Sequence, residues 1–315
     1  MKQCLYCYQP VDNETEFHPR CSKKIFGSLV PPVVPYSESD IDELALELVR
    51  SRNSVTGVQP KLSVEITTGA SKADPKRFTI VGLWGDYILK PPTSQYPHLP
   101  EVEDVTMHLA SLAKITCVPH SLIRLQSGCL AYITKRIDRT KHGKVHMEDM
   151  CQITERLTED KYYGSYEQIA KAIIKYSINP LLDCINFYEM VLFSFLTGNA
   201  DMHLKNFSLI CTPGIGYHLA PAYDMVSTAL VHPADTEELA LALNGKKRTI
   251  GRKDFMTAFA AISLDNKTIE SMMRKFEKSI PSWYEFIGHS FLPEDMKVEF
   301  VRLIQTRAEQ IRLEV

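Results

Sequence analysis

GNADMHLKNFSLI (residues 198–210), followed after a short gap by APAYDMVS (220–227), is the stretch that decides the fold of this chain. It places Asp201, Lys205 and Asn206 on one short loop, and Asp224 where a β-hairpin would return to that loop. In phosphoryl transfer a carboxylate orients or deprotonates a hydroxyl, and a lysine neutralises charge. An amide oxygen and a second carboxylate hold Mg²⁺ against the nucleotide phosphates. The two segments therefore predict a phosphotransferase site.

The spacing from Asp201 to Asn206 equals that of the catalytic loop of protein kinases. A structural interpretation is also open, in which Asp201 caps a turn after a helix, Asn206 bonds to loop backbone and Asp224 is a turn residue. Turns favour these residue types for their own reasons, so the loop alone does not decide between the two interpretations.

Two upstream segments follow the order that a kinase requires. FTIVGLWGDYILKPP (78–92) predicts two β-strands around a Gly-Asp turn, with Lys90 at the end of the second. LPEVEDVTMHLASLAK (99–114) has helical periodicity and carries Glu101 and Glu103 in its first turn. We expect Lys90 to neutralise nucleotide phosphates and Glu103 to pair with it. The alternatives are a solvated lysine and glutamates that merely favour a helix N-terminus.

Before Lys90 lies SRNSVTGVQPKLSVEI (51–66), where a phosphate-covering loop would be needed. Its single glycine, Gly57, matches neither the multi-glycine kinase loop nor the Walker A pattern. The functional interpretation is an anion-binding nest of backbone N–H groups around Val55, Thr56 and Gly57, assisted by the Ser54 hydroxyl. The alternative is a polar loop that leads into a strand.

Six segments, in chain order, resemble the signature segments of HipA-like serine/threonine kinases, the toxin components of bacterial toxin–antitoxin systems. They are SVTGVQPKLSV, YILKP, KRIDR, EDMCQ, GNADMHLKNFSLI and PAYDMVS, and the likeness covers roughly residues 40 to 315. The resemblance implies an α+β, two-lobed, protein-kinase-like (HipA-like) fold, with a β-rich N-lobe, a helical C-lobe and ATP between them.

The resemblance also implies residue roles. Asp201 would be the catalytic base, with Lys205 and His203 as further catalytic residues, while Asn206 and Asp224 would ligate Mg²⁺. Nucleotide contacts would come from Lys90, Glu103, Val55, Thr56, Gly57, Thr134, Lys135, Ile137, Met147, Glu148, His203, Asn206 and Asp224. In such kinases a serine of the glycine-poor loop is autophosphorylated. The matching residues are Ser54 and Thr56, where a phosphate would compete with ATP by charge.

Two departures from longer HipA proteins refine the resemblance. The chain has no room for their extra N-terminal subdomain, so it is closest to the short HipT type of tripartite systems. There, a small antitoxin resembles the missing subdomain and a second antitoxin binds DNA. In the segment expected to face adenine, Lys135 and Ile137 stand where longer members carry an acidic and an aromatic residue.

The N-terminal segment CLYCYQPVDNETEFHPRCSKKIFG (4–27) forms a separate Cys/His module. Cys4 and Cys7 make a Cys-x-x-Cys pair, and His18 with Cys21 makes a second pair, a spacing that suits a structural Zn²⁺ site. The alternatives are a disulfide, which a reducing cytoplasm disfavours, or thiols packed as small apolar groups.

Composition and charge fit a globular protein with 44% hydrophobic and 23% charged residues. A net charge of −2 gives no general footprint for direct nucleic-acid binding. No signal sequence opens the chain, and its longest apolar stretch (187–198) is too short for a membrane span. We expect a cytoplasmic protein, with export into another cell left open. It would comprise the module at 1–30, an N-lobe at 38–135 and a helical C-lobe at 136–315.

Three functions follow from these patterns. The favoured one is an ATP- and Mg²⁺-dependent serine/threonine kinase toxin that autophosphorylates and inhibits growth through a translation component. By resemblance, that protein substrate could be an aminoacyl-tRNA synthetase. The alternatives are a small-molecule phosphotransferase and a non-catalytic nucleotide-binding regulator.

Overall fold

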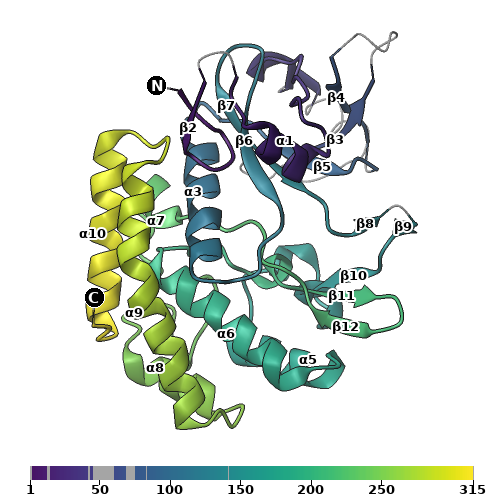
Figure 1. The fold of residues 1–315 in the computed structure, drawn as a ribbon. Helices are drawn as coiled ribbons and strands as arrows, with labels where there is room; N and C mark the ends of the chain where they lie inside the picture. The colour runs from purple at the N-terminus through teal and green to yellow at the C-terminus, as the bar shows by residue number, and fades with distance from the viewer. Residues whose placement is uncertain are drawn as a thin grey trace. The chain divides into compact units, whose positions relative to one another are not determined.

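The computed structural model describes residues 2–12, 15–41, 43–44, 60–68, 75–82, 84–140 and 142–314. These residues form two compact units (Figure 1). The N-terminal unit comprises Met1–Asp104 with Val118–Ile137, and the C-terminal unit comprises Val105–Cys117 with Asp138–Val315. Helix α3 (Leu99–Leu112) contributes residues to both units.

The N-terminal unit contains a five-stranded antiparallel sheet in the order β4-β3-β5-β7-β6. Its strands are β3 (Leu62–Thr67), β4 (Arg77–Ile80), β5 (Tyr87–Lys90), β6 (His120–Arg124) and β7 (Leu130–Lys135). Alternate residues such as Leu62 and Val64 are buried, because successive side chains of a strand point to opposite faces. In this register Lys90 lies opposite Tyr132.

Residues 2–27, here called the N-terminal module, precede this sheet. A two-stranded ribbon of β1 (Lys2–Gln3) and β2 (Pro10–Val11) is followed by α1 (Pro19–Phe26). Pro19 suits the first turn of α1, and Gly27 ends the helix in the left-handed conformation, with φ of 71°. Phe26 packs against Phe78 and Tyr87 of the sheet.

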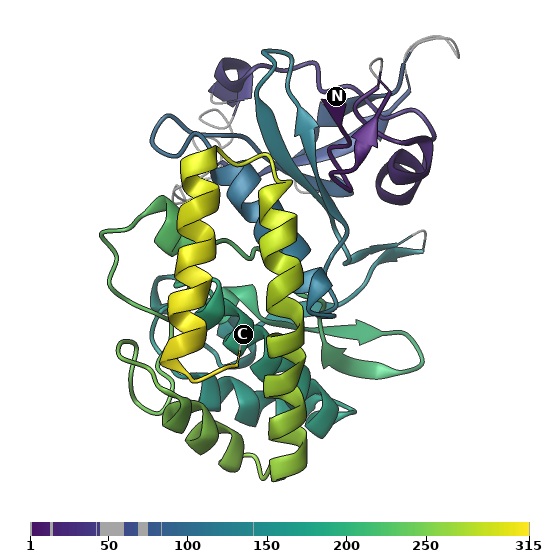
Figure 2. The same ribbon diagram turned by 60° about the vertical axis from the view of Figure 1, so that its left-hand side comes forward.

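The C-terminal unit combines helices with a three-stranded sheet in the order β10-β11-β12. Its strands are β10 (Met147–Asp149), β11 (Ser208–Thr212) and β12 (Gly216–Leu219), with β8 (Arg139–Thr140) and β9 (Gly143–Lys144) as a separate pair. Its helices are α4 (Met150–Ile153), α5 (Tyr166–Tyr176), α6 (Pro180–Leu196), α7 (Thr228–Val231), α8 (Arg252–Ala260), α9 (Asn266–Gly288) and α10 (Glu294–Gln310), with short 3₁₀ turns η1 (Thr158–Asp160) and η2 (Leu204–Asn206). Figure 2 shows α9 and α10 side by side.

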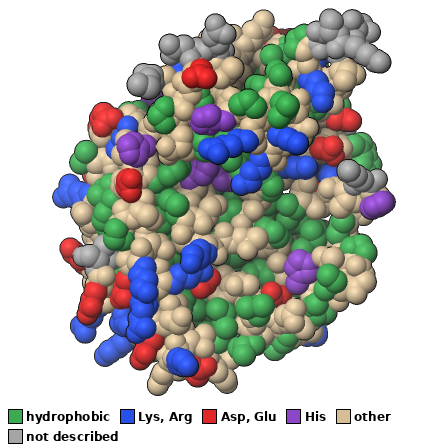
Figure 3. Space-filling model, viewed as in Figure 1, with side chains coloured by type: hydrophobic (Ala, Val, Ile, Leu, Met, Phe, Trp, Pro, Cys, Tyr) green, Lys and Arg blue, Asp and Glu red, His purple; other side chains and the backbone are tan. Residues whose placement is uncertain are grey.

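Helix α6 lies at the centre of this unit because its sequence is apolar around most of its circumference. Its Phe193 packs edge-on against Trp283 of α9, and Phe195 packs against Phe255 of α8. The surface is charged, with Lys and Arg side chains over α1 and mixed charges over α9 (Figure 3). Among the described residues, none of the helices combines the length and apolarity that crossing a bilayer requires.

The β-rich first part and helical second part confirm the predicted α+β class. Strands β4 and β5 and helix α3 lie where the sequence pattern predicts them. Most of the segment between the linker and β3, residues 45–59, lies outside the described residues.

Candidate phosphotransfer site

A tight turn at the end of α6 leads into the loop that carries Asp201. Gly198 adopts a left-handed conformation with φ of 66°. A Cβ at this position would lie 2.7 Å from Leu303 Cδ2 and 2.9 Å from the Ala229 Cβ. Glycine is therefore needed both for the backbone angle and for the space.

Two polar side chains hold the backbone of the loop that carries Asp201. The Asn199 Oδ1 accepts a hydrogen bond of 3.0 Å from the Asp201 backbone N–H, and the Thr228 Oγ1 accepts one of 2.8 Å from the Ala200 N–H. Asn199 is completely buried. The backbone around Asp201 is thus held by two partly buried hydrogen bonds, while the Asp201 side chain stays 40% exposed.

Asn206 is bonded directly to the loop that carries Asp201. Its Nδ2 donates a hydrogen bond of 2.9 Å to the Asp201 carbonyl oxygen. Asn206 is only 3% exposed, whereas the Asp201 side chain is 40% exposed. This contact leaves the Asn206 Oδ1 as the amide atom that can ligate a metal, beside a carboxylate that a substrate can reach.

Tyr162 and His203 surround the Asp201 carboxylate. The Tyr162 hydroxyl donates a hydrogen bond to Asp201 Oδ1, and His203 Nε2 lies 3.9 Å from the same oxygen. Burial lowers the pKa of His203, although the Asp201 charge opposes this, so the imidazole favours the neutral form. Burial and the charge of Asp201 raise the pKa of Tyr162, which keeps its phenol protonated as a donor.

Asp224 lies on the segment that follows β12, as the sequence predicts for a hairpin return. It has a left-handed backbone with φ of 58°. The preceding Tyr223 donates a hydrogen bond of 3.0 Å to the Lys205 carbonyl and lies 2.5 Å from the Ser208 Oγ. Burial contributes most to the raised pKa of Tyr162, followed by the charge of Asp201 and its hydrogen bond, and then by the charges of Asp235 and Asp224.

Lys205 forms an ion pair with Asp149, and the distance from its Nζ to Asp149 Oδ2 is 2.7 Å. Asp149 also caps α4 through a reciprocal pair of bonds with Gln152 and lies opposite Ser208 in the β10–β11 ladder. Neither Asp149 nor Tyr162 is among the site residues that the sequence predicts. The Asp-x-x-Gln capping pattern within EDMCQ was a signal for the former, whereas no local pattern marks Tyr162.

Lys90 and Glu103 pair as expected, inside the N-terminal unit. The Lys90 Nζ lies 2.5 Å from Glu103 Oε1, and the two side chains are 4% and 2% exposed. The Lys90 ammonium also lies over the Tyr132 ring, 5.2 Å from its centroid. A charged lysine is thereby kept in a buried position at the end of β5, while its contact with nucleotide stays a prediction.

The residues predicted to contact adenine lie in two strands and a turn. Thr134 and Lys135 end β7, where the Lys135 N–H donates to the Pro119 carbonyl at 2.8 Å. Ile137 follows in a turn, and Met147 and Glu148 belong to β10. Their nucleotide roles stay predictions. Ser54, Val55, Thr56 and Gly57 lie outside the described residues.

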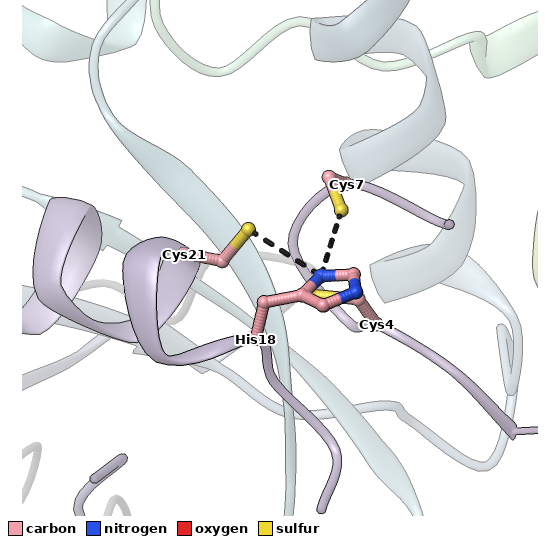
Figure 4. A group of neighbouring side chains, drawn as sticks. All are labelled: Cys4, Cys7, His18 and Cys21. Carbon is pink, nitrogen blue, oxygen red and sulfur yellow. Dashed lines mark hydrogen bonds between the residues drawn. The ribbon is translucent and has the colours of Figure 1, made fainter. Parts of the chain in front are cut away.

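The four predicted zinc ligands lie together in the N-terminal module (Figure 4). The ligand atoms of Cys4, Cys7, His18 and Cys21 all lie within 4.8 Å of one another. All eight cysteines of the chain are free thiols, so none of these residues forms a disulfide here.

A hollow of about 470 Å³ lies next to Tyr162 in the C-terminal unit. It is lined by Glu159, Tyr162, Tyr163, Gly164, Glu237 and Lys247. Tyr162, whose hydroxyl donates to Asp201, is thus one of the residues that line this hollow.

Comparison with known proteins gives a family and a set of relatives. The HipA-like C-terminal domain matches residues 53–284. Y4dM of Sinorhizobium fredii, which its name describes as a candidate kinase, is 32% identical over 71% of this chain and 57% of its own length. The serine/threonine-protein kinase toxin HipA of Shewanella oneidensis is 29% identical over 62% of this chain and 47% of its own length. The chain thus spans about half the length of these relatives.

Two solved structures share the fold. HipA in the Shewanella oneidensis complex with HipB and operator DNA matches with a TM-score of 0.68 and 24% identity, covering 82% of this chain and 65% of that one. The Helicobacter pylori proinflammatory kinase CtkA matches with a TM-score of 0.55 and 18% identity, covering 79% of this chain and 93% of that one. The kinase-like fold predicted from the sequence is therefore confirmed.

Proposed function

This chain belongs to the HipA-like C-terminal domain family, and we propose that it is an ATP- and Mg²⁺-dependent serine/threonine protein kinase that acts as a bacterial toxin. The observation that carries the proposal is the hydrogen bond from Asn206 to the Asp201 carbonyl. This bond holds the Asn206 amide on the loop that carries the accessible Asp201 carboxylate, which supports a metal ligand and a base acting together in phosphoryl transfer. The names of its relatives as kinases support the same activity.

In this proposal Asp201 accepts the proton of a substrate serine or threonine hydroxyl. The hydroxyl oxygen bonds to the γ-phosphorus as the bond to the β–γ bridging oxygen breaks, and ADP leaves. The Tyr162 phenol holds the Asp201 carboxylate in position, with neutral His203 nearby. Lys205, held by Asp149, places positive charge next to the reacting group. Lys90 binds the phosphates that remain on ADP.

Asn206 and Asp224 would hold the Mg²⁺, because amide and carboxylate oxygens are the hard donors that this ion prefers. The bound ion would supply charge neutralisation for the phosphates. The cysteines and histidine of the N-terminal module suit Zn²⁺ instead, in a purely structural role.

The regulatory and cellular parts of the proposal follow from the family. Ser54 and Thr56 would be the autophosphorylated residues, and the kinase would inhibit growth in the cytoplasm through a translation component such as an aminoacyl-tRNA synthetase. As a HipT-type member it would bind a small antitoxin and a DNA-binding antitoxin. The Shewanella oneidensis HipA structure, which contains HipB and operator DNA, supports partners of this kind.

Incubation of the purified protein with γ-labelled ATP tests the activity. Label should appear on serine or threonine in the wild type and should fall by several orders of magnitude in Asp201→Asn, because the base is lost. Asp295→Asn, which changes an exposed acid on α10, is the matched control and should keep full activity. Label on small metabolites alone would favour a small-molecule phosphotransferase. ATP binding without transfer would favour a regulator.

A further inference from the structure

The Cys/His cluster has the dimensions of a tetrahedral metal site. In such a site, a Zn–S bond of about 2.3 Å and a Zn–N bond of about 2.0 Å place sulfur and nitrogen about 3.6 Å apart. The His18 Nδ1 lies 3.4 Å from the Cys7 Sγ and 3.8 Å from the Cys21 Sγ. These two distances match that spacing, and the Cys4 Sγ lies within 4.8 Å of the other three ligand atoms (Figure 4).

A second contact orients the His18 ring for ligation. Its Nε2 lies 3.0 Å from the Pro10 carbonyl oxygen, which can only accept, so Nε2 carries the proton. Nδ1 then has a lone pair that faces the cysteines. Ligating histidines commonly donate their other N–H to a carbonyl in this way, which fixes both tautomer and ring orientation.

The module contains little regular structure of its own. In its described residues this structure consists of two strands of two residues and one helix of eight. Segments this small usually need a metal or disulfide to stay folded, and these cysteines are free thiols. Two of the four ligands, Cys4 and Cys21, are nonetheless buried.

The module is bonded to the segment that carries Glu103. The Tyr8 hydroxyl, buried in the module, donates a hydrogen bond of 2.7 Å to Asp104 Oδ2. The other oxygen, Oδ1, lies 2.7 Å from the His120 Nδ1. Asp104 is completely buried, so both contacts are shielded from water, and it directly follows Glu103 in α3.

The module also contacts the strand that carries Lys90. The Tyr87 hydroxyl donates a hydrogen bond of 3.0 Å to the Ile25 carbonyl of α1, and Phe26 packs against the Tyr87 ring. Tyr87 begins β5, the strand that ends at Lys90. Both partners of the buried ion pair are therefore attached to the same small module.

We infer that Cys4, Cys7, His18 and Cys21 bind one structural Zn²⁺, and that the zinc-closed module is a positioning element that holds Glu103 and Lys90 in register through Tyr8–Asp104 and Tyr87. The second half of this inference rests on the proposed role of Lys90 in binding nucleotide. The module lies before residue 53, where the family match begins.

Metal analysis of protein purified without chelators tests the site. Wild-type protein and Cys129→Ser, which changes an exposed cysteine of the same unit, should each contain about one Zn²⁺ per chain. Cys21→Ser and His18→Ala should lose most of it. Less than about half an equivalent in the wild type, or a predominance of another metal, would overturn the zinc assignment.

Tyr8→Phe tests the positioning role without touching a ligand. It should keep its zinc and raise the KM for ATP about tenfold, the loss expected for one hydrogen bond to a charged group. The kcat and the KM for protein substrate should change little. A general loss of folded protein would instead lower the apparent kcat, so the two effects can be told apart. Tyr176→Phe, at an exposed position on α5, is the control. An unchanged KM for ATP in Tyr8→Phe would overturn the positioning role.

Hydrogen exchange separates this inference from the proposed activity. Removing zinc from the wild type with a chelator should speed amide exchange in the first turns of α3 and in β5, whether or not the protein transfers phosphate. If the wild type fails to bind ATP, the proposed function fails while zinc content and exchange still decide the inference. Unchanged exchange after zinc removal would show that the module does not support the Lys90–Glu103 pair.

Discussion

The two units each contain a lysine–carboxylate pair, and the pairs differ in burial. Lys90 and Glu103 in the N-terminal unit are almost completely buried, whereas Lys205 and Asp149 in the C-terminal unit are 34% and 15% exposed. A buried charge that loses its partner is costly, while an exposed pair contributes little to stability. We therefore expect the Lys90–Glu103 pair to matter mainly for stability and positioning. The Lys205–Asp149 pair should matter mainly for the proposed reaction.

The largest expected effect is on the buried pair. Lys90→Met removes the lysine partner of the buried Glu103 carboxylate and should lower the free energy of unfolding by about 3–5 kcal/mol. Replacing both residues, as Lys90→Met with Glu103→Leu, should recover most of that loss, since neither charge of the pair remains. Urea unfolding of the three proteins measures this. Equal instability in single and double variants would show that the pair is not the reason for the loss.

The partly exposed pair of Lys205 and Asp149 should show the opposite balance. Lys205→Met should change the free energy of unfolding by only about 0–1 kcal/mol. Its rate of autophosphorylation should fall by about 10²–10³, because a charge that acts on the transferring group is lost. Stability and rate are compared on the same preparation. A Lys205→Met variant that is strongly destabilised, but whose remaining folded fraction keeps the wild-type rate, would contradict the proposed catalytic role of Lys205.

A smaller effect is expected from the hydrogen bond between the Tyr162 hydroxyl and the Asp201 carboxylate. Tyr162→Phe removes the hydroxyl that donates to Asp201 and should lower kcat about tenfold, the scale of one hydrogen bond to a charged group. Tyr163→Phe changes a largely exposed neighbour and should be neutral. Steady-state kinetics with saturating ATP would reveal the difference, and equal rates in the two variants would exclude a role for the Tyr162 hydroxyl.

The smallest effect concerns pH. Burial lowers the pKa of His203 below the ordinary value near 6.5, so in acid the unfolded chain binds a proton that the folded chain does not. This contribution to stability is present above pH 6.5 and is lost as the pH falls toward the lowered pKa. His203→Gln should therefore lose less thermal stability between pH 7.5 and 5.5 than the wild type. His142→Gln, at an exposed position, should behave like the wild type.

The sequence predicts those parts of the molecule that depend on local pattern. Alternation and a turn place Lys90 at the end of a strand, and helical periodicity places Glu103 in the following helix, which is why their contact could be predicted across 13 residues. Cysteine and histidine spacing likewise predicts the cluster of four ligand atoms, because each pair is local: Cys4 and Cys7 flank a turn, and His18 and Cys21 lie at the start of α1.

Contacts between distant segments could not be predicted in this way. Tyr162 reaches Asp201 across 39 residues, Asp149 reaches Lys205 across 56, and Tyr8 reaches Asp104 across 96. Each depends on how α5, α6 or the sheet packs, and residue spacing carries no record of that packing. The predicted nucleotide contacts also involve distant segments of the chain, and they stay predictions.

Asp224 combines a strained backbone with a side chain that the proposed reaction needs. Its φ of 58° costs a residue with a side chain about 1 kcal/mol, a strain that glycine would not bear. Asp224→Gly should relieve this strain while removing the carboxylate that we propose as a Mg²⁺ ligand. Under the proposed function, durability and catalysis would thus make opposite demands on this one position.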